Sequence, residues 1–312
     1  MLFEKEFGLN ITLWGTRGSI PTPGLQTVRY GGNTICLELR CDPDNRLIII
    51  DAGSGIRPLG GKVMGTDFKK GPIKTQIFFT HTHWDHIMGF PFFTPIYIPS
   101  TQMEIYGPVT YEDDPLDKVI GGQLQYRYFP VTSAELAAQI TYHRLSETEM
   151  DLGDGLKLIT KYLNHPIACL GYRFEQGGKS IVTIYDHEPF RNLFITDPTH
   201  PDYDRSAAEE GEIAAAEENK KIQNFMKNAD VVIHDSQYTQ KEYLKNKLGW
   251  GHSTYEWAIN SAQKAGVKTL VLTHHDPERT DDQLDELEQN YNRLIRGKTP
   301  MKVIFAREGM EL

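Results

Sequence analysis

The sequence is poor in cysteine, with three residues in a chain of 312. Three cysteines cannot all pair with one another. Cys36 and Cys169 lie in apolar stretches that are typical of strands, and Cys41 borders a loop. A disulfide framework of the kind that supports small secreted domains is therefore excluded, and we expect reduced thiols in a cytoplasmic protein.

Long apolar runs are also missing from the sequence. No stretch approaches the ~18 consecutive apolar residues that a membrane-spanning helix requires, so we expect no association with a membrane. Residues 1–6 lack a basic segment followed by an apolar one, and they therefore give no indication of a secretory signal.

Positive charge is in deficit. The chain carries 33 Lys and Arg residues against 42 Asp and Glu residues, which gives a formal net charge of −9. Proteins that neutralise many phosphates usually present a basic face, and no segment resembles a basic arm. The charge argues against a large nucleic acid as the main partner and leaves a small nucleotide open as a substrate.

The pattern of apolar residues predicts a mixed α/β protein. The sequence has no internal repeat, low-complexity tract or linker, so we predict one domain over residues 1–312. Helical patterns cover residues 206–227, 254–265 and 281–296, the second of which opens on a capping-box pair, Ser253 and Glu256. Strand-like runs cover residues 9–16, 34–39, 47–50, 77–80, 103–106, 139–143, 156–162, 169–175, 180–185, 231–233, 268–273 and 301–305.

One short stretch holds four potential metal ligands, His81, His83, Asp85 and His86, within six residues. It follows a strand-like run, and strand ends in α/β proteins are where sites are usually built. Four ligands this close together are too crowded for one tetrahedral ion. We therefore predict two divalent ions, with His81 and His83 on one and Asp85 and His86 on the other. Imidazole and carboxylate groups suit zinc, with manganese or iron as alternatives.

Three further candidates, His165, Asp186 and His274, each follow another strand-like run. A lone histidine after a strand is more often an ordinary polar residue, and a cluster that binds no metal is the corresponding alternative for the whole set. If the strands end at one edge of a sheet, His165 completes the first ion's ligands and His274 the second's, while Asp186 bridges. A water shared by two dications is deprotonated near neutral pH and would be the nucleophile.

The segment His81-Thr82-His83-Trp84-Asp85-His86 resembles the signature of the metallo-β-lactamase superfamily. Further motifs resemble the branch that includes ribonuclease Z and related phosphodiesterases, and the resemblance runs from about residue 11 to residue 277. The resemblance implies a four-layer αββα sandwich, a dinuclear site on one edge and a homodimer. The motifs are Gly15-Thr16, Gly171-Tyr172-Arg173, His234-Asp235, Gly251-His252-Ser253-Thr254 and Leu272-Thr273-His274.

The resemblance implies that His252 is the general acid of the branch, and a capping or packing role is the alternative for this residue. In the mechanism that we hypothesise, Asp85 would orient the hydroxide while it ligates, and Asp235 would orient His252. Ribonuclease Z normally has glutamate at the position of Asp235. It also has a glycine- and proline-rich basic arm, whereas segment 190–229 here is acidic and helical.

The loop at residues 17–21 is similar to that of uncharacterised hydrolases and cyclic-nucleotide phosphodiesterases of the branch. We therefore predict a dinuclear-metal phosphodiesterase that hydrolyses a small nucleotide, most simply a 3′,5′-cyclic nucleotide. The alternatives are a transfer-RNA 3′-end endonuclease, a lactonase or thioesterase on the same fold, and a non-enzymatic scaffold that retains metal.

Several residues keep two interpretations at this stage. Arg17 and Arg29 could bind an anionic group or be solvated loop residues. Asp51 could brace a metal-bound histidine or cap a helix. Residues 91–95 could form a wall near the site or belong to the core, and residues 108–130 could form a lid or an interface.

Overall fold

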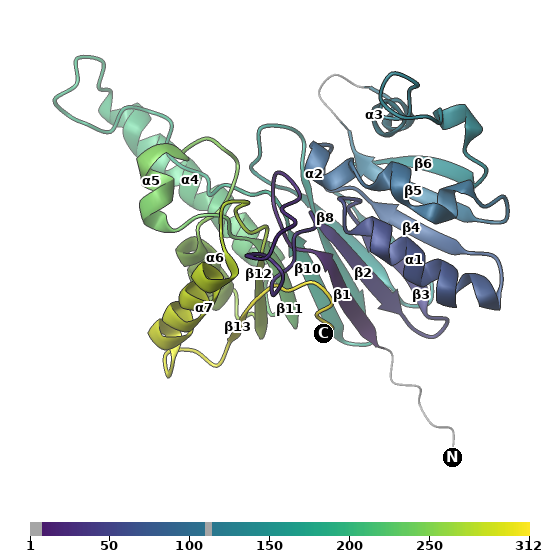
Figure 1. Ribbon diagram of the computed structural model, residues 1–312. Helices are drawn as coiled ribbons and strands as arrows, with labels where there is room; N and C mark the ends of the chain where they lie inside the picture. The colour runs from purple at the N-terminus through teal and green to yellow at the C-terminus, as the bar shows by residue number, and fades with distance from the viewer. Residues whose placement is uncertain (1–7, 110–113) are drawn as a thin grey trace.

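Two sheets lie face to face, and helices cover the outer face of each (Figure 1). The computed structural model describes residues 8–109 and 114–312. The prediction on the secretory signal concerns residues 1–6, which lie outside the described residues. Residues 110–113, within the segment considered as a lid or an interface, also lie outside them. The four-layer αββα arrangement predicted from the sequence is confirmed.

The first sheet has six strands in the order β1-β2-β3-β4-β5-β6, of which β3 to β6 run parallel. Strands β1, β2 and β3 pair antiparallel, in sequence order. The strands are β1 (Leu9–Gly15), β2 (Cys36–Cys41), β3 (Arg46–Ile50), β4 (Lys74–Phe78), β5 (Gln102–Pro108) and β6 (Gln139–Leu145). Its helical elements are α1 (Ile56–Thr66), η1 (Phe68–Lys70), α2 (Trp84–Ile87), η2 (Phe90–Phe92), η3 (Thr94–Tyr97), α3 (Leu116–Gly121) and η4 (Ser133–Glu135).

The second sheet has seven strands in the order β13-β12-β11-β10-β9-β8-β7, and β10 to β13 run parallel. Its strands are β7 (Glu149–Asp151), β8 (Lys157–Tyr162), β9 (Leu170–Gln176), β10 (Lys179–Ile184), β11 (Val231–Asp235), β12 (Thr269–Thr273) and β13 (Lys302–Phe305). Its helices are α4 (Arg205–Phe225), α5 (Gln240–Asn246), α6 (Tyr255–Lys264) and α7 (Asp281–Ile295).

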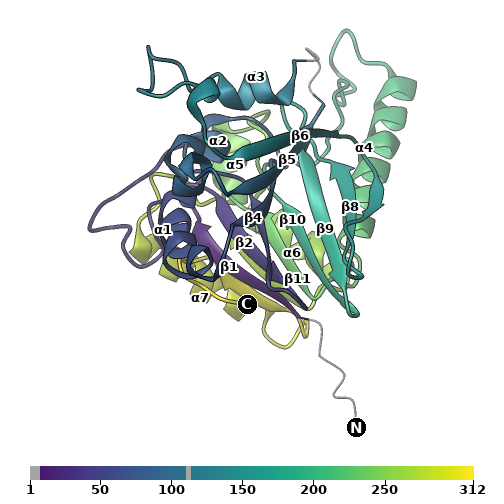
Figure 2. The same cartoon turned by 90° about the vertical axis from the view of Figure 1, so that its right-hand side faces the viewer.

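The main core lies between the two sheets, whose arrangement can be followed in Figure 2. Leu37 and Phe78 of the first sheet belong to the same buried cluster as Tyr172 and Val271 of the second. Two more clusters lie between the sheets and their outer helices. Burial of apolar side chains on both faces explains why the parallel strands read as continuous apolar runs rather than alternating ones.

Parallel pairing decides where the polar strand ends meet. Strands β10, β11 and β12 pair in register, so Asp186, Asp235 and His274 all emerge at one edge of the second sheet. Strand β4 ends just before His81, and β3 ends just before Asp51, at the facing edge of the first sheet. The chemistry-bearing residues therefore converge where the two sheets meet.

Helix α2 begins at Trp84, so Asp85 and His86 lie inside its single turn. One local prediction differs from the structure. The predicted capping box of Ser253 and Glu256 does not form, because Thr254 is the N-cap of α6 and accepts a hydrogen bond from the Trp257 amide. The Ser253 hydroxyl instead donates to the His187 carbonyl.

None of the helices within residues 8–109 and 114–312 combines the length and the apolar character that a membrane crossing demands.

Candidate metal centre

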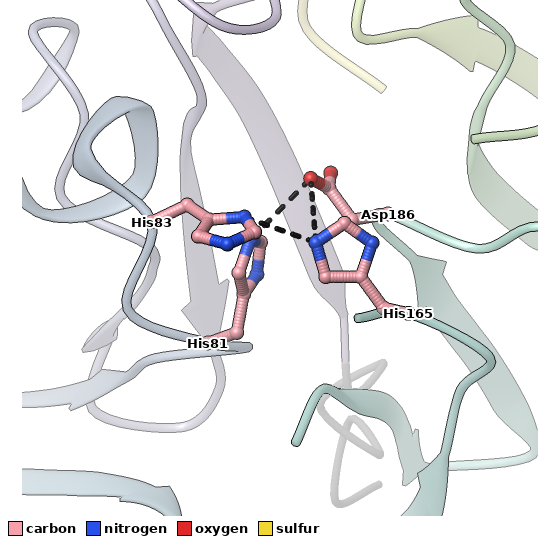
Figure 3. Close-up of side chains that lie close together, drawn as sticks. All are labelled: His81, His83, His165 and Asp186. Atoms are coloured by element: carbon pink, nitrogen blue, oxygen red, sulfur yellow. Dashed lines mark hydrogen bonds and ion pairs between the residues drawn. The ribbon is translucent and has the colours of Figure 1, made fainter. Parts of the chain in front are cut away.

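The first group of side chains consists of His81, His83, His165 and Asp186 (Figure 3). Their rings and carboxylate point toward one another from the loop after β4, the loop after β8 and the end of β10. The Nε2 atom of His165 lies 3.0 Å from Nδ1 of His83. One Asp186 oxygen, Oδ2, lies 3.4 Å from Nε2 of His81 and 3.8 Å from Nε2 of His165.

The second group consists of Asp85, His86, His274 and again Asp186. The other Asp186 oxygen, Oδ1, lies 3.3 Å from Nε2 of His86 and 3.1 Å from Nε2 of His274. Oδ2 of Asp85 lies 3.2 Å from the same His274 nitrogen and 3.5 Å from that of His86. Each Asp186 oxygen thus faces a different group.

Several buried polar atoms in the two groups have no hydrogen-bond partner among the described residues. They are Nε2 of His81, Nε2 of His86, Nδ1 of His274 and Oδ1 of Asp186. A buried polar atom without a partner costs about 1–3 kcal/mol, which a bound cation would offset. The donor set, its burial and the shared carboxylate fit a dinuclear metal centre. The structure brings all seven residues predicted as ligands together, in the predicted division into two sets.

Burial sets the protonation of the first group. It lowers the pKa of His83 to about 4 and that of His165 to about 2, and it also lowers the pKa of His81. Histidine binds metal as a neutral imidazole, so these three rings are in the ligating form at neutral pH. Burial also acts on His86, but the surrounding carboxylates, Asp186 first, outweigh it and raise the pKa of that ring.

Asp51 holds the second group in place. Oδ2 of Asp51 lies 2.8 Å from Nδ1 of His86, and both oxygens accept hydrogen bonds from Thr80, one from its amide and one from its hydroxyl. Helix α1 has Gly55 at its N-cap and no side-chain cap, so Asp51 does not cap it. Of the two roles considered for Asp51, the structure favours support of a candidate metal-binding histidine over capping of a helix.

The backbone is strained at three positions of the centre. Asp51, Asp186 and His274 have φ values of 59°, 50° and 61°, in the left-handed region that non-glycine residues seldom adopt. Such conformations cost of order 1–3 kcal/mol each and cluster at functional sites. Asp51 and His274 follow β3 and β12 directly, and Asp186 lies two residues after the end of β10, so the strain is located where these strands end at the metal centre.

A second polar pair, His252 and Asp235, lies beside the centre. Nδ1 of His252 lies 3.2 Å from Oδ2 of Asp235, which also accepts from the amides of His187 and Ser253. Burial alone would lower the pKa of His252, but the carboxylates of Asp235 and Asp186 outweigh it and raise that pKa to about 9. The ring is therefore a proton donor at neutral pH. Although Asp235 is shorter than glutamate, it reaches His252.

Sequence reasoning missed Glu188, which holds the loop that carries His252. Its buried carboxylate accepts hydrogen bonds from the Gly249 and Gly251 amides, each at 2.8 Å, and from the Tyr243 hydroxyl at 2.6 Å. The Gly251 carbonyl in turn lies 3.0 Å from Nδ1 of His165. The available signal was an acidic residue two positions after Asp186.

We expect Glu188→Gln to lower both stability and turnover. A carboxamide keeps one acceptor oxygen but replaces the other with an N–H donor, so one of the two backbone amides loses its acceptor. The free energy of unfolding should therefore fall by about 1–3 kcal/mol. Thermal unfolding measures the first effect and kcat the second. Glu209→Gln on exposed α4 is the control. Unchanged kcat with lowered stability would limit Glu188 to a structural role.

Gly18 permits the close approach of the N-terminal loop to His274. A Cβ added there would lie 2.3 Å from Cε1 of His274, and the Gly18 amide donates to the His275 carbonyl. Its neighbour Ser19 donates an amide hydrogen bond of 2.6 Å to Oδ2 of Asp85. The loop after β1 therefore supports Asp85 and His274 of the second group.

We expect Gly18→Ala to weaken binding of one ion selectively. The new methyl group displaces His274, so affinity at the second group should fall roughly 10–100-fold while the first group keeps its ion. Stepwise titration of the apoprotein with Zn²⁺ measures both sites. Gly61→Ala, where a Cβ has nothing within 4 Å, is the control. Equal weakening of both sites would contradict the division into two groups.

The two loop arginines are structural. Arg17 is fully buried and donates to the carbonyls of Gly31 and Arg279. Arg29 pairs with Asp282 and Asp285 on α7. Neither is free to bind an anion, and of the two only Arg29, with 52% of its side chain exposed, keeps contact with solvent.

No protein-family profile matches the chain. Among curated proteins it is similar to ribonuclease Z of Lactococcus lactis, with 28% identity over 273 residues that cover 78% of this chain and 83% of that protein. A solved structure, the metallo-β-lactamase fold protein YhfI from Bacillus subtilis, has 17% identity, covers 99% of both chains and gives a TM-score of 0.63. The short form of human tRNase Z has 21% identity, covers 97% of this chain and 98% of that one, and gives a TM-score of 0.59.

These comparisons contradict two predictions. The predicted substrate, a small cyclic nucleotide, is wrong, and so is the exclusion of a large nucleic acid, because the similar proteins are named as ribonucleases. The exclusion rested on net charge, which averages the whole surface. Much of the negative charge lies on α4 and α7, in the outer layer over the second sheet (Figure 1), and says little about the surface around the metal centre.

Proposed function

Since the chain has the metallo-β-lactamase fold and resembles the ribonuclease Z branch of that superfamily, we propose that it cleaves precursor transfer RNA near its 3′ end. In this role it is a metal-dependent hydrolase of phosphodiesters. The observation that carries the proposal is the pair of ligand groups sharing Asp186, next to the His252–Asp235 pair. The similarity to ribonuclease Z over 78% of the chain supplies the substrate.

The seven residues already described would hold two divalent ions, for which we propose zinc on the basis of the imidazole-rich donor set. Manganese and iron are the alternatives. When bound, such a pair of ions activates water near neutral pH and polarises the phosphoryl oxygens. Elemental analysis of the purified protein identifies the metal.

The protein's own side chains supply the remaining chemistry. Asp85, fixed by the Ser19 amide, would orient the attacking water. His252 would donate a proton to the leaving oxygen through Nε2, because Nδ1 is engaged by Asp235. Asp235 thereby acts as a positioning residue, in the manner of a carboxylate that fixes a histidine's tautomer.

The test uses purified protein of known metal content and a precursor transfer RNA with a 3′ trailer. We expect release of the trailer and a strong decrease in affinity with rising salt. Chelator-treated protein is the control. Two ions per chain without cleavage of the precursor would overturn the proposal. If carboxylic esters turned over in place of phosphodiesters, the lactonase or thioesterase alternative would replace it.

Three other features stay predictions. We propose one domain, because a single core is shared by both sheets. The homodimer is implied by the resemblance alone. A cytoplasmic location agrees with three free, buried cysteines.

A further inference from the structure

An apolar pocket of about 580 Å³ lies beside the metal centre, between α2, η2, α3 and the segment after α3. The same stretch of chain contributes residues to the pocket and to the metal centre. His81, His83 and Asp85 belong to the metal centre, whereas the intervening Thr82 and Trp84 line the pocket. Successive residues of this stretch therefore belong alternately to the metal centre and to the pocket. A group bound in the pocket would lie next to the metal centre.

Exposed aromatic rings form the walls of the pocket. Trp84 is 79% exposed, Tyr128 72% and Phe92 53%. Phe92 is held by an edge-to-face contact with Phe129, with ring centroids 5.3 Å apart. The side-chain amide of Gln123 donates a hydrogen bond of 3.0 Å to the Ile87 carbonyl at the end of α2, which connects the segment after α3 to the turn that carries Asp85 and His86. The pocket is therefore built into the structure, and its rings face solvent.

We propose that this pocket stacks an unpaired nucleobase of the nucleic-acid substrate, next to the phosphodiester that the metal centre cleaves. The inference rests on the proposed function, because a base flanking the scissile phosphate must lie close to the metal-binding turn. Every nucleobase presents an aromatic face, so stacking on Trp84 binds without selecting a sequence.

The chemistry of the lining favours a base over a peptide or a second copy of the chain. No charged residue lines the pocket, and Thr82 and Gln123 add only hydrogen-bonding groups that suit the edge of a base. Lys118 and Arg127 adjoin lining residues in the sequence and are exposed, where they can meet the flanking phosphates. The pocket volume lies in the ~300–1,000 Å³ range of small-ligand sites.

The test compares Trp84→Ala, Trp84→Phe and the wild type on precursor transfer RNA, with and without abasic nucleotides on either side of the cleavage site. We expect Trp84→Ala to raise KM roughly 5- to 150-fold with little change in kcat, and Trp84→Phe to retain most of the affinity. On the abasic substrate the penalty of Trp84→Ala should vanish, because the base it contacts is already gone. Phe68→Ala, an exposed aromatic outside the pocket, is the control.

Two further measurements separate this inference from the proposed function. Binding of a short single-stranded oligonucleotide to the metal-loaded protein is followed independently of cleavage. If the wild type cut no precursor but oligonucleotide binding still required an aromatic residue at 84, the function would fail and the subsite would stand. If precursor cleavage and oligonucleotide binding were both insensitive to Trp84→Ala, the subsite would be refuted. Conversion of a dimer to a monomer by Trp84→Ala in sedimentation would assign the pocket to a second copy and refute it as well.

Discussion

Asp186→Asn is expected to abolish turnover while the fold is retained. Asp186 is the one residue shared by both groups, with Oδ1 3.1 Å from His274 Nε2 and Oδ2 3.4 Å from His81 Nε2. Asparagine keeps the shape of the side chain and tolerates the left-handed backbone at this position. An amide nitrogen cannot ligate a cation, so one of the two contacts is lost. We expect kcat to fall on the order of 10³-fold or more, since nucleophile activation and charge stabilisation are lost together.

Metal content gives an independent readout of this variant. Elemental analysis should find fewer than two ions per chain, and circular dichroism should remain that of the wild type. Asp197→Asn, an exposed carboxylate in the loop before α4, is the matched control and should retain two ions and full activity. Two tightly held ions in Asp186→Asn with near-normal kcat would remove this carboxylate from its bridging role.

The ligand residues could be found from sequence because they lie at or shortly after the ends of apolar strand-like runs, which His81, Asp186 and His274 follow directly. Because β10, β11 and β12 pair in parallel, the residues that follow them lie close together in space. Asp186 and His274 therefore meet although 88 positions of the sequence separate them (274 − 186). Some of the residues that support these ligands could not be identified from the sequence. Glu188 and Gly18 act through backbone contacts to distant segments, and no local pattern encodes such contacts.

Helix α1 illustrates why some elements escaped prediction. It contains Pro58, Gly60 and Gly61, residues that weaken helices in isolation. Tertiary packing overrides this propensity, because Ile56, Leu59 and Val63 are fully buried. Gly60 permits the close approach, since a Cβ there would lie 3.0 Å from the ring of Phe93. The substrate was predicted wrongly for a different reason, because net charge carries no information on where the charges lie on the surface.

His252→Ala should separate proton transfer from metal binding. If His252 protonates the leaving oxygen, its removal should lower kcat on precursor transfer RNA by about 10²–10⁴-fold. The same variant should lose far less activity on a nitrophenyl phosphodiester, because nitrophenolate leaves without protonation. Metal content should stay at the wild-type value, since the seven proposed ligands are intact.

Asp235→Asn provides the matched comparison for His252→Ala. An asparagine at 235 can still contact Nδ1 of His252, which lies 3.2 Å away, but it no longer stabilises the protonated ring. We expect kcat on precursor transfer RNA to fall about 10–100-fold, less than for His252→Ala, with the same insensitivity on the nitrophenyl substrate. Asp235 contacts His252 and lies 3.9 Å from Nδ1 of His274, so loss of metal in Asp235→Asn would instead make it a support for the second group. If His252→Ala impaired both substrates equally, His252 would act through binding or packing, and protonation of the leaving oxygen would fall to water or another residue.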